Sequence, residues 1–260
     1  MRFKTLVSLI ATVVIAMGIA SAHAGEKLRI GVEGAYPPFS WKEPDGTLKG
    51  FDIDIAWALC EKMGRDCELV EQDWDGMIPA LLAKKYDAIV ASMSITEERK
   101  KKVNFTGKYY NTPAMFVAPK NTSVQATPEG LKGKSVGVQR ATIHQCYMEK
   151  MFPDAELRLY ATQEEVFLDL ASGRIDAQIS DSVQALEGFL NTDAGKEFDF
   201  LGGVQFDLEC HGEGAGIALR KDEDDLRMSF NEAINAIRAD GTYAKINEKY
   251  FDFDVFGAGM

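Results

Sequence analysis

The chain has 260 residues and a formal net charge of −11 at neutral pH. An acidic surface repels phosphate groups, which argues against nucleic acids and anionic membranes as partners. The length fits either one large α/β domain or two lobes of about 100 residues each, and composition does not choose between them.

The first residues have the pattern of an export signal. Arg2 and Lys4 give a positive start, and an apolar run over residues 6–20 precedes Ala22-His23-Ala24, a small-residue cleavage pattern. A membrane anchor is the alternative, but the run is shorter than the roughly 20 apolar residues that span a bilayer. We therefore expect a signal peptide over residues 1–24 that is cleaved after Ala24.

Removal of residues 1–24 leaves 236 of the 260 residues and, because Arg2 and Lys4 go with them, changes the formal charge from −11 to −13. No cysteine near the cleavage point is available to carry a lipid. We expect a soluble periplasmic protein whose acidic character suits a cationic ligand.

Four cysteines remain after cleavage: Cys60, Cys67, Cys146 and Cys210. In an oxidising compartment an even number predicts disulfides, and four cysteines allow three pairings. Cys60 lies at the end of a predicted helix and Cys67 at the start of the next predicted strand, close enough to bridge. We predict that bridge and a second pair, Cys146 with Cys210; the alternative is that all four are buried thiols.

From Lys27 onward, strand-like segments alternate with helix-like segments, which predicts mostly parallel sheets covered by helices. Apolar residues recur at helical spacing from Phe51 to Met63, and Gly64 follows as a stop signal. The first series contains predicted strands at 28–32, 67–70 and 87–91 and predicted helices at 51–63, 77–84 and 97–102.

The alternation breaks twice, and each break is a candidate crossing between lobes. After Tyr109 comes an extended stretch, 112–118, and then a polar loop, 121–127. Glycines gather at the second break, between residues 202 and 216. Between the breaks lie predicted strands at 135–138, 156–160 and 176–179 and predicted helices at 143–151, 163–171 and 182–190. Helices at 227–238 and 242–250 close the chain.

Polar side chains follow several predicted strands. Glu33 follows the first strand, Ser92 and Ser94 follow the strand at 87–91, and Thr142 and Asp181 follow two strands of the second series. Ligands of open parallel sheets bind beyond the carboxyl ends of the strands, so we expect these residues to lie together. For Thr142 and Asp181, capping of the following helix is an alternative explanation.

The segment Gly50-Phe51-Asp52-Ile53-Asp54-Ile55 resembles the signature of the periplasmic polar amino-acid-binding proteins of ABC importers, solute-binding protein family 3. The similarity continues in the family's order through most of the exported chain, at Arg29-Ile30-Gly31, Tyr36-Pro37-Pro38-Phe39, Asp87-Ala88-Ile89, Ser94-Ile95-Thr96, Gly137-Val138, Gly173-Arg174-Ile175-Asp176-Ala177, Gly241-Thr242-Tyr243 and Lys249-Tyr250-Phe251. The pattern is most similar to lysine/arginine/ornithine-binding and histidine-binding proteins, whose short loop disulfide corresponds to Cys60 and Cys67. The region of Tyr36 and Trp74 also resembles opine-binding members.

This resemblance implies a two-lobed α/β fold, in which each lobe is a mostly parallel sheet flanked by helices and two strands join the lobes. It places the first lobe in residues 25–112 and 207–260 and the second in residues 113–206. The implied function is to close the lobes around a basic L-amino acid, arginine first and then ornithine, lysine or histidine. The protein would deliver this ligand to an inner-membrane ABC permease as a monomer, without a cofactor or metal.

The resemblance also implies roles for the residues after the strands. Arg99 corresponds to the anchor of the ligand's α-carboxylate, and its paired donors suit that group, although its charged neighbours are also typical of a surface arginine. Ser92 and Ser94 correspond to positions that bind the α-carboxylate and α-ammonium, and Thr142 to a carboxylate contact at a helix start. Asp181 corresponds to the acid that pairs with the α-ammonium, which opine binders lack.

The ligand's side chain would contact a second group of residues. Tyr36 and Trp74 correspond to aromatics that sandwich its stem, although such aromatics are commonly core residues, and Glu33 corresponds to an acid facing its cationic head. Ala91 stands where the family has a serine that helps to hold the distal nitrogen. His144 is a further candidate for the pocket, with a surface position as the alternative.

Other departures from the family pattern affect the same region. Glu33 is one methylene longer than the family's aspartate, and Ala141 stands where a glycine is frequent, which leaves the backbone approach to the ligand open. Two rival functions share the fold: an enzyme resembling cyclohexadienyl dehydratases and a sensor-only binding module. The enzyme would have to hold a dicarboxylate, whereas Arg99 against Glu33 and Asp181 suits a zwitterion with an extra positive charge.

Overall fold

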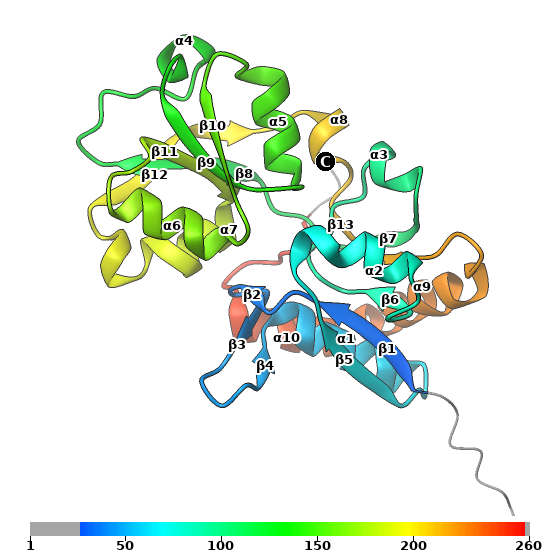
Figure 1. The fold of residues 1–260 in the computed structure, drawn as a ribbon. Helices are drawn as coiled ribbons and strands as arrows, with labels where there is room; N and C mark the ends of the chain where they lie inside the picture. Colours follow the sequence, from blue (N-terminus) through cyan, green and yellow to red (C-terminus); the bar gives the residue numbers. More distant parts are fainter. Residues whose placement is uncertain (1–26, 258–260) are drawn as a thin grey trace, which may run out of the picture.

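The computed structural model describes residues 27–257, which form two lobes, each built on a five-stranded mixed sheet (Figure 1). The expected two-lobed α/β fold is therefore confirmed. The predicted signal peptide at residues 1–24 lies outside the described residues. Within residues 27–257, no helix is long and apolar enough to cross a membrane.

The sheet of the first lobe takes strands from both ends of the described chain. In sheet order its strands are β5 (Cys67–Glu71), β1 (Leu28–Val32), β6 (Ala88–Ile89), β13 (Ala215–Leu219) and β7 (Asn104–Tyr110). The strands β5, β1 and β6 are parallel, and β13 pairs antiparallel with both β6 and β7. One strand of the five is thus reversed, so the carboxyl ends of the other four point the same way.

Helices cover the core of this lobe: α1 (Phe51–Lys62), α2 (Met77–Leu82), α3 (Glu97–Lys100), α9 (Asp224–Ala239) and α10 (Thr242–Tyr250). Of these, α1, α9 and α10 pack against one another. A turn of 3₁₀ helix, Trp74–Gly76, precedes α2. A small antiparallel sheet, β2 (Ala35–Tyr36), β3 (Ser40–Lys42) and β4 (Leu48–Lys49), follows β1.

The start of α1 requires a glycine. Gly50 has a φ of 132°, and a Cβ at this position would lie 2.2 Å from the carbonyl oxygen of Phe39. Any other side chain would therefore force the entry of α1 away from Phe39, which is fully buried. The helix then buries Ile55 and Leu59 in the core.

The second lobe repeats the arrangement with strands in the order β10 (Glu156–Tyr160), β9 (Ser135–Gln139), β11 (Ala177–Asp181), β8 (Ala114–Pro119) and β12 (Phe198–Gln205). Here β10, β9 and β11 are parallel and β8 is the reversed strand. Its helices are α4 (Pro128–Leu131), α5 (Ile143–Met151), α6 (Gln163–Ala171), α7 (Ser182–Ala185) with a π-helical turn at Leu186–Leu190, a 3₁₀ turn at Asp193–Gly195, and α8 (Leu208–His211).

The chain passes between the sheets twice, from β7 to β8 over residues 111–113 and from β12 to β13 over residues 206–214. The first passage lies at the start of the first break in the sequence pattern, most of which forms β8 and a loop of the second lobe, and the second passage lies within the second break; we propose both passages as lobe boundaries. On the return, α8 packs against α5 of the second lobe. The disulfide between Cys146 and Cys210 joins these two helices, and the disulfide between Cys60 and Cys67 joins α1 to β5.

Several elements differ from the sequence-based expectation. The sequence pattern does not predict β7, β12 or β13. The strand β13 is buried along its whole length, so it lacks the alternation that signals a half-exposed strand, and glycines flank it. The predicted strand at 87–91 forms ladder pairs only at Ala88–Ile89. The predicted helix at 182–190 is a four-residue α-helix that continues as a π-helical turn.

Candidate functional site

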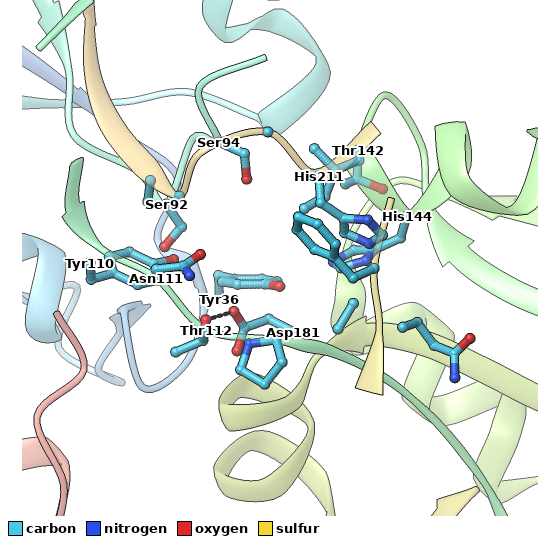
Figure 2. Close-up of a pocket in the computed structure, with 18 of the residues that line it drawn as sticks. Tyr36, Ser92, Ser94, Tyr110, Asn111, Thr112, Thr142, His144, Asp181 and His211 are labelled. Carbon is cyan, nitrogen blue, oxygen red and sulfur yellow. Dashed lines mark hydrogen bonds between the residues drawn. The ribbon is translucent and has the colours of Figure 1, made fainter. Parts of the chain in front are cut away.

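A cavity of about 380 Å³ lies where the two lobes and both passages meet. Figure 2 shows Ser92 and Tyr110 on one side of it and His144 and His211 on the other. The first lobe contributes Glu33, Tyr36, Trp74, Ser92, Ser94 and Arg99; the second contributes Gln139, Thr142, His144 and Asp181; and the passages contribute Asn111, Thr112, Phe206, His211 and Gly212, among others.

The sheet topology explains why these side chains converge. Glu33 directly follows β1, Ser92 and Ser94 follow β6, Thr142 follows β9, and Asp181 is the last residue of β11. All four strands belong to the parallel sets of their sheets, so their carboxyl ends face the space between the lobes. The prediction from strand ends thus agrees with the placement of these five residues around the cavity.

Arg99 has no acidic partner within residues 27–257. Its Nη1 donates to the carbonyl of Ser94 at 3.0 Å and its Nη2 donates to the carbonyl of Ala141 at 3.4 Å. The guanidinium also lies 5.2 Å from the ring centroid of Trp74. Burial lowers the pKa of this guanidinium to about 10, which leaves it charged at neutral pH. A ligand carboxylate would supply the missing counter-charge.

Asp181 serves two purposes in the structure. Its Oδ1 accepts hydrogen bonds from the backbone N–H groups of Val183 (2.9 Å) and Gln184 (3.2 Å), so it caps α7. Its Oδ2 accepts a hydrogen bond from Thr112, drawn in Figure 2. Burial raises the pKa of this carboxyl to about 6, and no cation of the described residues neutralises it. The capping alternative is therefore realised, and the same side chain still lines the cavity.

Glu33 is the second acid of the cavity wall and is buried. Its Oε1 accepts a hydrogen bond of 2.6 Å from Nε2 of Gln139, across the space between the lobes. Burial raises the pKa of Glu33 to about 7, and the nearby carboxylates of Asp52 and Asp73 add to that increase. A buried carboxylate without a cation is costly to ionise, so this position favours a cationic ligand group.

Tyr36 and Trp74 both line the cavity. The indole Nε1 of Trp74 donates to the carbonyl of Ala141 at 3.2 Å, so this ring from the first lobe is held by the second. Arg99 lies over this ring, and the hydrogen bond at the ring's edge leaves its remaining apolar surface for packing against an aliphatic or planar cationic group.

The turn between β9 and α5 brings the second lobe to the cavity. Thr142 caps α5 by accepting from the N–H of Gln145 at 3.3 Å. The preceding Ala141 has a φ of 59°, in the left-handed region that favours glycine, which explains why a glycine suits this position. Arg140, by contrast, forms an ion pair with Asp75 and does not line the cavity.

His144 and His211 form a pair of buried rings on one wall, with centroids 6.1 Å apart. Nδ1 of His144 and Nε2 of His211 have no hydrogen-bond partner among residues 27–257. Burial lowers the pKa of His144 to about 3, and the charges of His211 and Arg99 act in the same direction. The pair therefore offers the cavity neutral imidazole groups near Arg99.

Two outcomes depart from the sequence-based site. Ala91 is buried in the core of the first lobe beside Trp74 and Met77 and does not line the cavity. Gln139 and His211, which sequence reasoning did not select, do line it. Gln139 lies one residue beyond the predicted strand at 135–138, so the rule of strand ends could have found it. His211 is the last residue of the four-residue helix α8, within the glycine-rich second break, and no periodic pattern marks it.

The charges of the cavity wall are unbalanced. The wall holds one cationic side chain, Arg99, and two carboxyl groups, Glu33 and Asp181. Within residues 27–257, no group of three histidine, cysteine or acidic side chains could hold a metal ion. The arrangement is suited to binding a small molecule that carries one carboxylate and two cationic groups.

Comparisons with known proteins agree with this geometry. An L-arginine-binding protein of Pseudomonas aeruginosa is 48% identical to the chain over 98% of this chain and 99% of its own length. The lysine/arginine/ornithine-binding periplasmic protein of Escherichia coli strain K12 is 42% identical over 92% of this chain and 93% of its own.

A solved structure and a family model show the same similarity. An ancestral arginine-binding protein bound to arginine has a TM-score of 0.81 and 38% identity, covering 88% of this chain and 100% of that one. The family model of the bacterial extracellular solute-binding proteins, family 3, matches residues 28–253. The match spans both lobes and the cavity between them, and the chain belongs to the bacterial extracellular solute-binding proteins, family 3.

Proposed function

We propose that this protein is the periplasmic substrate-binding component of an ABC transporter and that it captures a basic L-amino acid, arginine before ornithine, lysine and histidine. The similarity to arginine-binding and lysine/arginine/ornithine-binding proteins over nearly the whole chain supports the transport role and the class of ligand.

One observation carries the proposal: the charges of the cavity wall complement a basic amino acid. Arg99 lacks an acidic partner, and Glu33 and Asp181 lack a cationic one. A basic amino acid brings one carboxylate and two cations, so each wall charge gains a partner without leaving a ligand charge unpaired. Buried charges are tolerated only when they are paired, which makes this match a strong criterion.

Each part of the ligand then has a place. The α-carboxylate binds Arg99, whose two terminal nitrogens suit a carboxylate, and the α-ammonium binds Asp181. The aliphatic stem lies between Tyr36 and Trp74, and the distal cation faces Glu33. A planar guanidinium can donate two hydrogen bonds to one carboxylate, which favours arginine over the compact ammonium of lysine or ornithine.

Closure of the lobes completes the binding site. Trp74 donates to Ala141 and Gln139 donates to Glu33, and each of these bonds joins one lobe to the other around the cavity. Because the site is assembled from both lobes, a ligand that touches both stabilises the closed form over an open one. A permease could then recognise the loaded protein by its closed shape.

The proposal includes export and a set of partners. The leader at residues 1–24 would direct the chain to the periplasm and be removed there. The mature protein would act as a monomer, without a cofactor, and its partner would be an inner-membrane permease complex. A dicarboxylate substrate, as in the related dehydratases, is not favoured, because it would set two anions against Glu33 and Asp181 with Arg99 as the one cation.

The test is calorimetric titration of protein that has been unfolded, stripped of ligand and refolded. Arginine, ornithine, lysine and histidine are titrated separately. Glutamine, glutamate, octopine and nopaline are titrated in the same way to represent the other ligand classes. We expect the basic amino acids to bind and arginine to bind most tightly. Tighter binding of glutamine or glutamate would contradict the basic ligand and leave the roles of Arg99 and Asp181 intact.

A further inference from the structure

The motif Gly50-Phe51-Asp52-Ile53-Asp54-Ile55 contains an acid that the proposed binding mode does not use. Asp52, in the first turn of α1, is fully buried and does not line the cavity. Within the described residues it forms no ion pair. A buried carboxylate of this kind is expensive for the fold, so its hydrogen-bond partners indicate what it does.

Both carboxylate oxygens of Asp52 accept a hydroxyl hydrogen bond. Oδ2 accepts from Oγ of Ser92 at 2.8 Å, and Oδ1 accepts from the hydroxyl of Tyr109 at 2.8 Å. The hydroxyl oxygen of Tyr109 in turn accepts from the backbone N–H of Ser92 at 3.0 Å. Ser92 is thus held at both its side chain and its backbone by one buried pair, Asp52 and Tyr109.

When Asp52 is ionised, this network fixes the direction of each proton. A serine hydroxyl has one proton, and that of Ser92 is committed to Asp52, so its oxygen can only accept a hydrogen bond from the cavity. The backbone of Ser92 is also constrained, with a φ of 54° in the left-handed region that non-glycine residues rarely adopt. Ser92 lines the cavity (Figure 2), and its hydrogen bonds to Asp52 and Tyr109 hold it in this orientation.

We propose that Asp52 is a positioning residue of the binding site: by accepting the protons of Ser92 and Tyr109, it makes Ser92 an obligatory acceptor for a nitrogen donor of the amino acid. The inference rests on the proposed amino-acid-binding function and deepens it. It assigns Ser92 to a cationic group of the ligand and excludes it as a donor to the carboxylate.

The electrostatics of Asp52 are consistent with this role. Burial, together with the charge of Asp181, raises the pKa of Asp52 to about 7, against the hydrogen bonds from Tyr109 and Ser92, which lower it. A ligand cation at Ser92 favours the ionised carboxylate, so binding near neutral pH releases protons. The titratable groups that interact with Asp52 are Glu33 after β1, Tyr36 on β2, Tyr109 and Tyr110 on β7, Asp181 on β11 and Tyr243 on α10.

A double-mutant cycle tests the proposal. Arginine is titrated calorimetrically into the unmutated protein, Asp52→Asn, Ser92→Ala and the double variant. We expect Asp52→Asn to weaken binding about tenfold, and to weaken it much less when Ser92 is already alanine, because residues that act through one another couple in this way. Titration in buffers of different ionisation enthalpy should also show fewer protons released by Asp52→Asn than by the unmutated protein.

The same motif provides a matched control. Asp54 lies two residues along α1 and accepts hydrogen bonds from Tyr250 (2.9 Å) and Lys249 (3.0 Å), away from the cavity. Asp54→Asn should leave affinity and proton release unchanged. If Asp52→Asn does not fold, Tyr109→Phe replaces it in the cycle, because that variant removes the other anchor of Ser92.

The outcomes separate this inference from the proposed function. The positioning role would be overturned if the double variant lost affinity by the product of the two single-variant losses. It would also be overturned if Asp52→Asn bound arginine with normal affinity. Binding of a different amino acid would contradict the basic ligand alone, and the cycle is then run with that amino acid, since each carries an α-ammonium. No binding of any amino acid would overturn both.

Discussion

In the proposed binding mode, Arg99 and Asp181 pair with the carboxylate and the ammonium that every α-amino acid carries. We expect Arg99→Ala and Asp181→Asn each to weaken arginine binding by roughly 2 to 5 kcal/mol, because each variant leaves a buried ligand charge without its partner. Asparagine is chosen at 181 because it still caps α7, which preserves the turn. Calorimetry measures the loss, and thermal unfolding checks the fold.

A matched variant controls for the loss of an arginine. Arg158 pairs with Glu156 on the same strand, β10, on the surface of the second lobe and outside the cavity, so Arg158→Ala should bind arginine nearly as well as the unmutated protein does. If Arg99→Ala or Asp181→Asn binds with unchanged affinity, that residue does not belong to the site.

Glu33 should affect stability in a pH-dependent way. Its pKa rises from 4.5 in the unfolded chain to about 7 in the fold, so the folded protein holds this proton more tightly than the unfolded chain does. The stability that this proton contributes is fully present below about pH 4.5 and is lost as the pH rises through about 7. Glu33→Gln should therefore stabilise the ligand-free protein at about pH 8, by up to roughly 3 kcal/mol, and the two proteins should converge toward about pH 5. Urea unfolding across this range measures the difference.

The exposed Glu68 on β5 provides the control for this experiment, since Glu68→Gln removes the same charge from the surface. Its effect should be small and should not follow the same pH profile. Equal stability of Glu33→Gln and the unmutated protein at about pH 8 would show that Glu33 is not held in an unfavourable charged state.

At the residue scale, motif spacing located much of the cavity wall, and the physical reasons for success and failure differ by residue. Asp181 ends a strand, so both topology and family resemblance point to it, whereas Arg99 lies in α3 and only the resemblance points to it. Ala91 has the right position in the sequence, but its side chain faces the core. The role of Asp52 is hidden in a sequence because it depends on contacts to Ser92 and Tyr109, which lie far along the chain.

At the scale of elements, the two disulfides should differ in their contribution to stability. The pair Cys146–Cys210 spans 64 positions, whereas Cys60–Cys67 spans 7. Chain entropy then predicts a contribution of about 4 kcal/mol for the longer loop and about 2.5 kcal/mol for the shorter one. Replacement of each pair by serine, followed by urea unfolding, tests this order, and peptide mapping without reduction checks the pairings. A larger loss for the Cys60–Cys67 pair would contradict the prediction.

The predicted and observed elements differ in a systematic way. The amphipathic helices α1, α5, α6 and α10 were found nearly to the residue, because their apolar positions recur with helical spacing. The strands β12 and β13 were missed because glycines interrupt them or flank them and neither alternates cleanly. Both lie next to the second passage, so the missed elements are those that join the lobes.

At the scale of the whole molecule, the function depends on two lobes that share one cavity. The alternation of strands and helices predicted the fold class, and the proposed lobe boundaries lie at or within the two breaks of that alternation. Contacts across the cavity, such as Gln139 with Glu33, depend on how the lobes approach each other, which no local pattern encodes. The choice of ligand is likewise a property of the assembled cavity.

A crystal structure of the protein with bound arginine tests the central claim most directly. We predict the α-carboxylate on Arg99, the α-ammonium beside Asp181 and the guanidinium facing Glu33, with the stem between Tyr36 and Trp74. A reversed ligand, with its carboxylate near Glu33 or its guanidinium near Arg99, would contradict the account.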